Sequence, residues 1–234
     1  MPLHLGDKEV DQVFLGTKEL SQIYLGTKEI WTNVKTEDLG TAKEWDIKKL
    51  YPGLYKKLTA DNFLVVDSNT AASNFGIRMN PGDDTDYWHI HAHLYKDYDP
   101  STGKLSCYTR IHGDASGTNT VHVIMVTKLD KLILLGTGTK FNVSGYAGYN
   151  KFTLDNFLVS STSGETNYYN SFYAQSYPYS GSGSASANIH KKYNASSGVL
   201  ECYFRHNQGN TDDVYTWFNF SADLSVKVYL RTEI

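Results

Sequence analysis

The sequence predicts an all-β protein, and three observations lead to this prediction. Its 18 Tyr, 19 Gly and many Ser, Thr and Asn residues favour short strands joined by turns, and stretches typical of helices are few. Apolar and polar residues alternate in several short segments. Two internal repeats divide the chain, one of ten residues and one of about 94 residues. We therefore expect short N-terminal β-hairpin repeats followed by two tandem, related β-sandwich domains of a jelly-roll-like kind.

The ten-residue repeat fills residues 1–34. Its three copies begin at Leu3, Val13 and Ile23 and share Leu-Gly, then Thr or Asp, then Lys-Glu. Apolar residues alternate up to each Gly, where the chain reverses, so each copy predicts a strand, a tight turn and a second strand. Because so small a hairpin does not bury its own apolar face, we expect this segment to attach the chain to other subunits. The residues expected to carry the attachment are Phe14, Leu15, Gly16, Tyr24, Leu25, Gly26 and Trp31.

Residues 35–50 are expected to link the repeats to the main body. They contain "LGTAKEW", Leu39 to Trp45, which has two interpretations. It is a degenerate fourth copy of the ten-residue word, or it opens a short helix in which Thr41 and Glu44 form a capping box.

The longer repeat builds the main body. "YKKLTADNFLV" returns as "YNKFTLDNFLV", which places Asn156 94 residues after Asn62, and "YDPSTGKLSCYTR" returns as "YNASSGVLECYFR". We expect two copies of one fold, at 51–143 and 144–234, each the size of a small β-sandwich. The turns "DPSTG" and "NASSG" are typical of hairpin loops that end in a left-handed Gly.

Alternation in the aligned hairpins predicts which residues face the core. Leu105 and Cys107 are expected to point inward, whereas Tyr108 and Arg110 point outward. Cys107 and Cys202 occupy equivalent positions of two separate domains, too far apart for a disulfide. We expect both thiols to be free, as is typical of a reducing compartment, and to be small buried core residues; a reactive role is the alternative.

Charge and hydropathy argue against two classes of protein. The formal net charge of −3, the isoelectric point near 6.2 and the scattered basic residues argue against nucleic-acid binding. No apolar run approaches the roughly 20 residues that cross a bilayer, and Met1 leads into the polar repeat without a basic and apolar leader. We expect no membrane insertion and no Sec export.

Three histidines in "YWHIHAHLY", His89, His91 and His93, are spaced to share one face of a strand. Imidazoles in this arrangement bind transition metals, particularly where symmetry brings copies together. The second copy has other polar residues at these positions, Ser184, Ser186 and Asn188. No metal is therefore favoured, and the face is expected to be a polar one that meets solvent or another subunit; a pH-sensitive interface is the third interpretation.

No motif indicates catalysis or a cofactor. The cluster of Asp83, Asp84 and Asp86 follows Pro-Gly and is typical of a solvated turn, with calcium binding and glycosidase chemistry as alternatives. The chain lacks the nucleophile-elbow, zinc-protease, P-loop and dinucleotide-binding motifs. We expect a protein that is not an enzyme and that has no cofactor.

The two copies differ most between Ser160 and Asn188, where the second copy sets many aromatic residues among Ser, Gly and Asn. This composition is typical of adaptable recognition surfaces, and aromatic rings also stack on sugars. The alternative is that these rings fill a core or a subunit interface. The candidate residues for binding a receptor or glycan are Tyr168, Tyr169, Phe172, Tyr173, Tyr177 and Tyr179.

The words "VFLGTKELSQ" and "IYLGTKEIWT" resemble the Leu-Gly-Ser/Thr-Lys repeats of bacteriophage tail and fibre proteins, notably of phages of Gram-positive and gut bacteria. "YKKLTADNFLV" and "YDPSTGKL" are similar to phrases from the β-rich bodies of such proteins. The resemblance implies a virion structural protein, often a homotrimer, that docks on the particle by its N-terminal part and projects its β domains, commonly towards host glycans or surface proteins. The absence of a coiled-coil or collagen-like shaft favours a short fibre or spike.

Three functions are compatible with the sequence. The first is a short homotrimeric fibre or spike of a phage tail or head, assembled in the bacterial host cytoplasm, with other virion proteins and a host receptor or glycan as partners. The second is a stand-alone, monomeric carbohydrate-binding module. The third is a purely structural decoration protein of a capsid or baseplate, which forms oligomers and binds no host surface.

Overall fold

The fold is known from a computed structural model that describes most of the chain. The described backbone covers 4–5, 8–9, 13–15, 18–20, 22–25, 28–32, 36–68, 72–78, 87–113, 117–129, 132–162, 168–171, 180–210 and 219–232. The described side chains are those of 36–68, 92–111, 117–129, 132–162, 186–207 and 222–232. Antiparallel strands dominate these residues, and the α-helix α1 (Ile47–Leu50) has only four residues. The predicted all-β class is confirmed.

Each copy of the ten-residue repeat forms one antiparallel β-hairpin. The three hairpins are β1 (His4–Leu5) with β2 (Lys8–Glu9), β3 (Val13–Leu15) with β4 (Lys18–Leu20), and β5 (Gln22–Leu25) with β6 (Lys28–Thr32). The Leu and Lys that flank the turn of each word are paired, as Leu25 and Lys28 are in the third hairpin. The predicted strands are confirmed, and each hairpin is a two-stranded sheet of its own.

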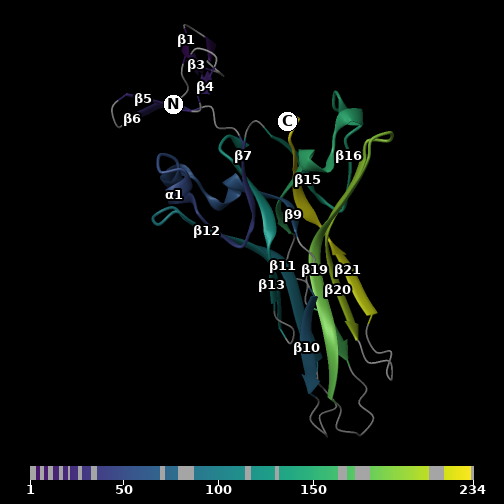
Figure 1. The fold of residues 1–234 in the computed structure, drawn as a ribbon. Helices are drawn as coiled ribbons and strands as arrows, with labels where there is room; N and C mark the ends of the chain where they lie inside the picture. The colour runs from purple at the N-terminus through teal and green to yellow at the C-terminus, as the bar shows by residue number, and fades with distance from the viewer. Residues whose placement is uncertain are drawn as a thin grey trace.

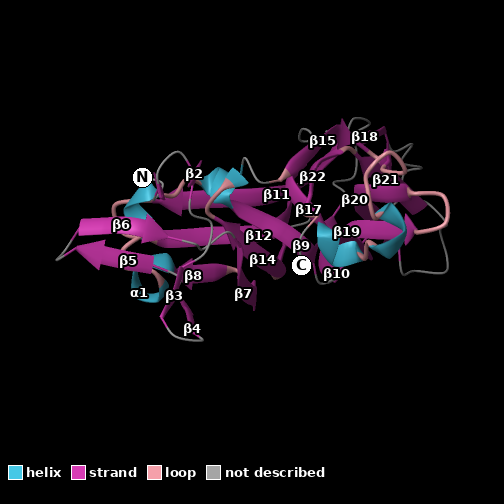
Figure 2. Cartoon of the chain, turned by 90° about the horizontal axis from the view of Figure 1, so that it is seen from above, coloured by secondary structure: helices cyan, strands magenta, loops and turns pink. Residues whose placement is uncertain are grey.

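Three larger sheets form the body (Figures 1 and 2). The central sheet has the order β15 (Ile133–Gly138), β22 (Val226–Leu230), β17 (Phe157–Thr162), β9 (Phe63–Ser68), β14 (Val121–Val126), β7 (Thr36–Ala42). Lateral sheet 1 has the order β13 (Gly117–Asn119), β12 (Lys104–Gly113), β11 (Tyr87–Asp99), β18 (Tyr168–Ser171), and β8 (Glu44–Asp46) also pairs with β12. Lateral sheet 2 has the order β10 (Ala72–Arg78), β19 (Ser180–Asn194), β20 (Val199–Asn210), β16 (Lys140–Asn142), and β21 (Asn219–Leu224) also pairs with β20.

Both copies of the longer repeat contribute strands to the central sheet. Three neighbouring strands, β7, β14 and β9, come from the first copy, and β17, β22 and β15 come from the second. The copies meet where β9 and β17 run antiparallel and Val65 pairs with Val159. The structure therefore does not confirm two separate sandwiches, because one continuous sheet joins the copies.

The copies also exchange a strand. The first-copy strand β10 pairs with second-copy β19, and the second-copy strand β18 pairs with first-copy β11. At both crossings a hydroxyl at the end of a central strand accepts a backbone hydrogen bond from the other copy. Ser68 Oγ accepts from the amide of Ile189 at 2.7 Å, and Thr162 Oγ1 accepts from the amide of Leu94 at 3.2 Å.

Residues 36–46, expected to be linker, form strands of the body. β7 pairs with β14 in the central sheet, and β8 pairs with β12 in lateral sheet 1. The helix interpretation of "LGTAKEW" is wrong, because α1 begins later and Asp46, whose Oδ1 accepts from the amide of Lys49, is its N-cap. The interpretation as a fourth copy of the ten-residue word also fails, because each of the three copies forms a hairpin whereas β7 and β8 lie in different sheets.

The same "LGT" letters recur at the start of the second copy. β15 and β16, which lie within the expected range 51–143, pair with the second-copy strands β22 and β20. Gly40 in β7 and Gly136 in β15 both have positive φ, 75° and 109°. The structural repeat thus begins at these strands, before the "YKKLTADNFLV" and "YNKFTLDNFLV" words.

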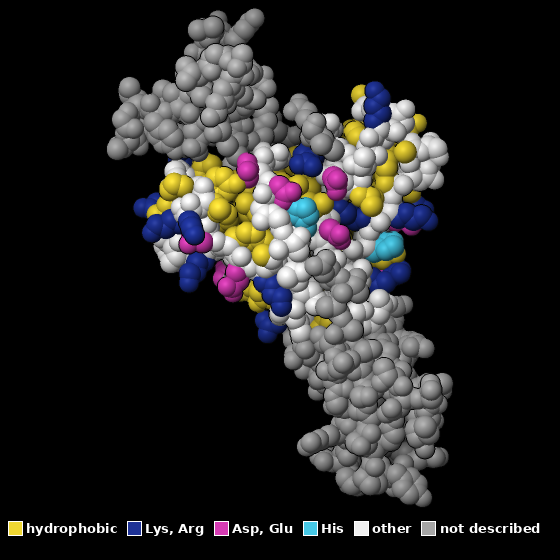
Figure 3. Space-filling model, in the orientation of Figure 1, with side chains coloured by type: hydrophobic (Ala, Val, Ile, Leu, Met, Phe, Trp, Pro, Cys, Tyr) yellow, Lys and Arg dark blue, Asp and Glu magenta, His cyan; other side chains and the backbone are white. Residues whose placement is uncertain are grey.

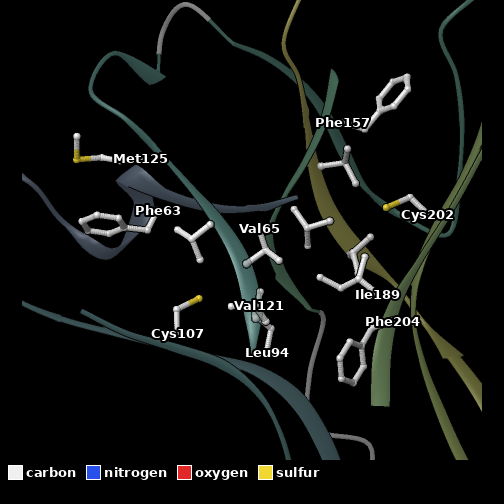
Figure 4. Packing of buried hydrophobic residues seen from close by; sticks show 14 of the residues in the cluster. Phe63, Val65, Leu94, Cys107, Val121, Met125, Phe157, Ile189, Cys202 and Phe204 are labelled. Carbon is white, nitrogen blue, oxygen red and sulfur yellow. The ribbon is translucent and has the colours of Figure 1, made fainter. Parts of the chain in front are cut away.

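One hydrophobic core packs between the central sheet and both lateral sheets. Buried residues of all three sheets belong to it, and Figure 4 shows Cys107 and Cys202 on either side of Val65. Both cysteines are free and fully buried, as predicted. Burial raises the pKa of each thiol to about 12, so both stay protonated at neutral pH and fit the core interpretation rather than the reactive one.

Short 3₁₀ helices precede the central strands and are anchored identically in both copies. They are η1 (Tyr55–Lys57), η2 (Ala60–Asn62), η4 (Tyr149–Lys151) and η5 (Leu154–Asn156). Lys96 in β11 donates from Nζ to two backbone carbonyls around η2, and Lys191 in β19 does the same around η5, at 2.9 to 3.1 Å. Burial lowers the pKa of both lysines, and these carbonyls compensate for the lost water.

Candidate functional site

The strand exchange brings two sequence-predicted groups side by side. In lateral sheet 1, Tyr168 of β18 pairs with Ile90 of β11, and Tyr169 pairs with His89. The backbone of the predicted aromatic segment therefore lies beside the backbone of the three-histidine strand. The other predicted aromatic residues, Phe172, Tyr173, Tyr177 and Tyr179, lie outside the described residues, as do the side chains of Tyr168 and Tyr169.

Two pairs of strand ends mark one end of the body. Arg78, the last residue of β10, pairs with Ser180, the first residue of β19. Tyr87, the first residue of β11, pairs with Ser171, the last residue of β18. The strands that flank segment 79–86, which carries Asp83, Asp84 and Asp86, are therefore paired with the strands that flank segment 172–179. In Figure 1 this end, where β10 terminates, lies opposite the three hairpins.

The histidine interpretations remain predictions. The side chains of His89 and His91 are not described, and His93 is half-buried on β11, opposite Arg110 of β12. Among the described side chains there is no group of three or more His, Cys, Asp or Glu that could hold a metal ion. The predicted strand itself is confirmed, since all three histidines lie in β11.

The attachment residues are placed by their backbone. Phe14 and Leu15 lie in β3, Tyr24 and Leu25 in β5 and Trp31 in β6. The two turn glycines, Gly16 and Gly26, lie outside the described residues.

The outward faces of the lateral sheets carry paired aromatic and charged side chains. On lateral sheet 2 the rings of His190 and Tyr203 stack with centroids 4.6 Å apart. Arg205 there donates from Nε to Oδ1 of Asp223 at 2.8 Å and from Nη2 to Oδ2 at 3.0 Å. This double hydrogen bond raises the pKa of Arg205 and lowers the pKa of Asp223. Its Nη2 also donates to the Tyr203 hydroxyl at 2.8 Å, and its guanidinium lies over the Tyr203 ring.

The same face of lateral sheet 1 has different charges. Tyr95 and Tyr108 stack with centroids 4.7 Å apart and planes 20° apart. The exposed Arg110 pairs in register with the exposed Thr118 of β13. Lys43 donates from Nζ to both the carbonyl and the hydroxyl oxygen of Thr118, each at 2.8 Å. The predicted alternation is confirmed in this hairpin, because Leu105 and Cys107 are buried while Arg110 is exposed.

The sequence pattern does not reveal which residues lie beside the two arginines on the next strand. Thr118 and Asp223 stand at the same register position, but they follow Arg110 and Arg205 by 8 and 18 residues respectively. The only signal was the Arg that recurs after "CYT" and "CYF".

The described face in Figure 3 shows Lys, Arg, Asp and Glu scattered among hydrophobic side chains rather than gathered by sign. None of the helices in the described part of the chain is long and apolar enough to span a bilayer.

Comparison with known proteins gives no match: no protein-family model, curated protein or solved structure matches the chain.

Proposed function

We propose that this chain is a short homotrimeric fibre or spike of a phage particle, docked by its N-terminal hairpins and carrying a surface for a host receptor or glycan at the opposite end. The observation that carries the proposal is the division of the molecule. Three small hairpins, each a separate two-stranded sheet, precede a large all-β body.

The hairpins support an assembly role because they are too small to be stable alone. Their strands have two to five residues, and an isolated two-stranded hairpin is marginally stable in water. Apolar and aromatic residues such as Phe14, Tyr24 and Trp31 lie in these strands. Contact with other subunits or with the particle would cover them.

The far end of the body supports a recognition role. The strand exchange places Tyr168 and Tyr169 in the lateral sheet formed by first-copy strands. The Tyr, Ser, Gly and Asn composition of segment 163–179 suits adaptable contacts. A fibre that docks by the hairpins would present this end to the host.

Light scattering on the full chain and on a chain starting at Thr36 tests assembly. Thr36 is the correct start because β7 is part of the central sheet and must be kept. We expect a trimer for the full chain and a monomer for the shortened one. A full chain that is monomeric would leave the carbohydrate-binding module as the working function.

Binding of the labelled full chain to a panel of gut and Gram-positive bacteria tests recognition. We expect binding to at least one strain and weaker binding by the Tyr168→Ala, Tyr169→Ala double variant. Stable trimers that bind no cell would favour the purely structural decoration protein.

A further inference from the structure

We infer that the outward face of lateral sheet 1 binds the carboxylate group of an acidic sugar residue at Arg110, Lys43 and Thr118. The inference rests on the proposed function, host-surface glycan binding, and adds a ligand class and a second surface to it. This carboxylate site is separate from the tyrosine-rich end of the body.

The two copies of the fold provide an internal comparison for Arg110. Arg205 is its equivalent on lateral sheet 2, and the residue opposite Arg205 is Asp223, whose two carboxylate oxygens accept two hydrogen bonds from the guanidinium. Arg110 lies between His93 of β11 and Thr118 of β13, so Thr118 takes the position that Asp223 has beside Arg205. An arginine fork matches a carboxylate in this geometry, and in the first copy the chain does not supply the carboxylate at that register position.

A second difference raises the positive charge of the first copy. The carbonyl of Lys43 accepts from the amide of Cys107, just as the carbonyl of Thr139 accepts from the amide of Cys202. The first copy thus has Lys where the second has Thr, and Thr where the second has Asp. Equivalent positions hold two cations in the first copy and one cation with one anion in the second.

Donors on the carboxylate site remain available to a ligand. No hydrogen bond or ion pair joins Arg110 to another described residue, and its guanidinium carries five N–H donors. Lys43 uses two of its three ammonium donors on Thr118. Arg110 and Thr118 are both exposed.

Among the described side chains, the carboxylates on this face lie away from Arg110. Asp97 and Glu44 both pair in register with Ser106, which lies four residues along β12 from Arg110. At the rise of a β-strand this distance is about 13 Å. Residues that pair in register across the sheet form one row. The Tyr95 and Tyr108 pair occupies the row between them.

The tyrosine pair favours a sugar as the bearer of the carboxylate. In the second copy Arg205 lies over the Tyr203 ring, with its guanidinium carbon 4.9 Å from the centroid. In the part of the chain that the structure describes, no cation lies over Tyr108, whose ring stacks on Tyr95. A sugar with its carboxylate at Arg110 has this aromatic row beside it, and aromatic surfaces contact the C–H groups of sugar rings.

Calorimetric titration of the full chain with two matched glycosides tests the inference. Methyl galacturonoside and methyl galactoside share one ring and differ in a carboxylate against a hydroxymethyl group. We expect the galacturonoside to bind and the galactoside to bind at least about tenfold more weakly. A tri-aspartate peptide as third ligand separates a sugar carboxylate from a peptide carboxylate, and we expect it to bind more weakly than the galacturonoside.

Two variants of the carboxylate site and one matched control sharpen the test. Arg110→Ala is expected to weaken galacturonoside binding by about tenfold or more. Thr118→Asp places at this position the acid that the second copy has, so it should weaken galacturonoside binding to a similar extent without lowering the midpoint of thermal unfolding. Arg205→Ala, on lateral sheet 2, should leave binding unchanged.

The inference is overturned if neither glycoside binds, if both bind equally, if the peptide binds more tightly, or if Thr118→Asp binds like the wild type. Cell binding separates this failure from failure of the proposed function. Host cells that bind wild type, Arg110→Ala and Thr118→Asp equally would overturn the carboxylate site and leave the receptor function standing. A full chain that binds no cell would count against the receptor function itself.

Discussion

Individual residues differ between the copies at buried positions as well as on the surface. His206 of β20 is 1% exposed, and its equivalent in the first copy is Ile111, also 1% exposed. Both pair in register with a buried alanine, Ala187 for His206 and Ala92 for Ile111. Burial lowers the pKa of His206 to about 4. The second copy therefore holds a neutral imidazole where the first holds a hydrocarbon.

Replacing His206 by Ile should make the fold less sensitive to acid. Because the folded pKa of about 4 lies below the unfolded value near 6.5, the unfolded chain takes up the proton first as the pH falls. The contribution of His206 to the free energy of unfolding should be fully present above pH 6.5 and should be lost as the pH falls towards 4. The loss from this group is on the order of 3 kcal/mol.

Urea unfolding of both proteins at pH 7.5 and pH 4.5 measures the effect. The carboxylates contribute to both curves alike, so the difference between wild type and His206→Ile isolates the imidazole. An equal loss of stability in the two proteins would mean that His206 is protonated in the fold.

Alternation predicts which side chains a strand turns inward, and it succeeded for Cys107 and Arg110. Alternation does not predict which residue of the neighbouring strand lies opposite a given side chain. Thr118 and Asp223 reach equivalent positions only because loops of different length precede β13 and β21. The register of the sheet was therefore needed to distinguish Arg205, which is paired with an acid, from Arg110, which is not.

In the turns of the two long hairpins, the type of a single residue decides whether the local backbone conformation can form. Gly103 and Gly198 have φ of 75° and 68°, which confirms the predicted left-handed glycines. A Cβ on Gly103 would lie 2.6 Å from Cβ of Lys48, and one on Gly198 would lie 2.7 Å from the backbone nitrogen of Ser144. Each turn is thus fitted against the segment that follows β8 or β16.

Gly103→Ala should destabilise the fold more than Gly40→Ala. Both glycines have φ of 75°, but a Cβ on Gly40 meets nothing within 4 Å. Gly40→Ala reports strain alone, about 1 kcal/mol. Gly103→Ala adds a clash with α1 and should cost about 1 to 3 kcal/mol more. Chemical denaturation of the two variants gives the comparison, and equal costs would show that α1 moves aside freely.

Whole elements were predictable where the signal is local and not where the partner is remote. The hairpin words predicted β1 to β6, because strand, turn and strand are contiguous. Residues 36–46 were expected to be part of a linker because their partner strands, β14 and β12, follow more than 50 residues later and leave no local signal. The exchange of β10 and β18 escaped prediction for a related reason: a period of two gives the face of a strand, not its neighbour.

The molecule as a whole resembles a dimer joined into one chain. Val65 pairs with Val159, its own equivalent 94 residues later, so this pair lies where the two copies face each other antiparallel. The exchanged strands β10 and β18 lie in equivalent places of the two lateral sheets. Contacts of this kind are self-complementary and are the usual basis of twofold, strand-swapped dimers.

The first copy alone, residues 36–129, should therefore form a homodimer. It contains β7 to β14, but in the described part of the full chain its β10 pairs with β19 of the other copy, and its β9 pairs at Val65 with Val159 of the other copy. A second identical copy supplies both, because β9 can pair with itself and each β10 can replace β18 beside the partner's β11. Light scattering over a range of concentrations, with circular dichroism to confirm the β signal, should show twice the mass of one copy and dissociation only with loss of structure. A folded monomer would mean that β10 returns to its own sheet, and that the exchange arises from joining the copies rather than from the pairing preference of each.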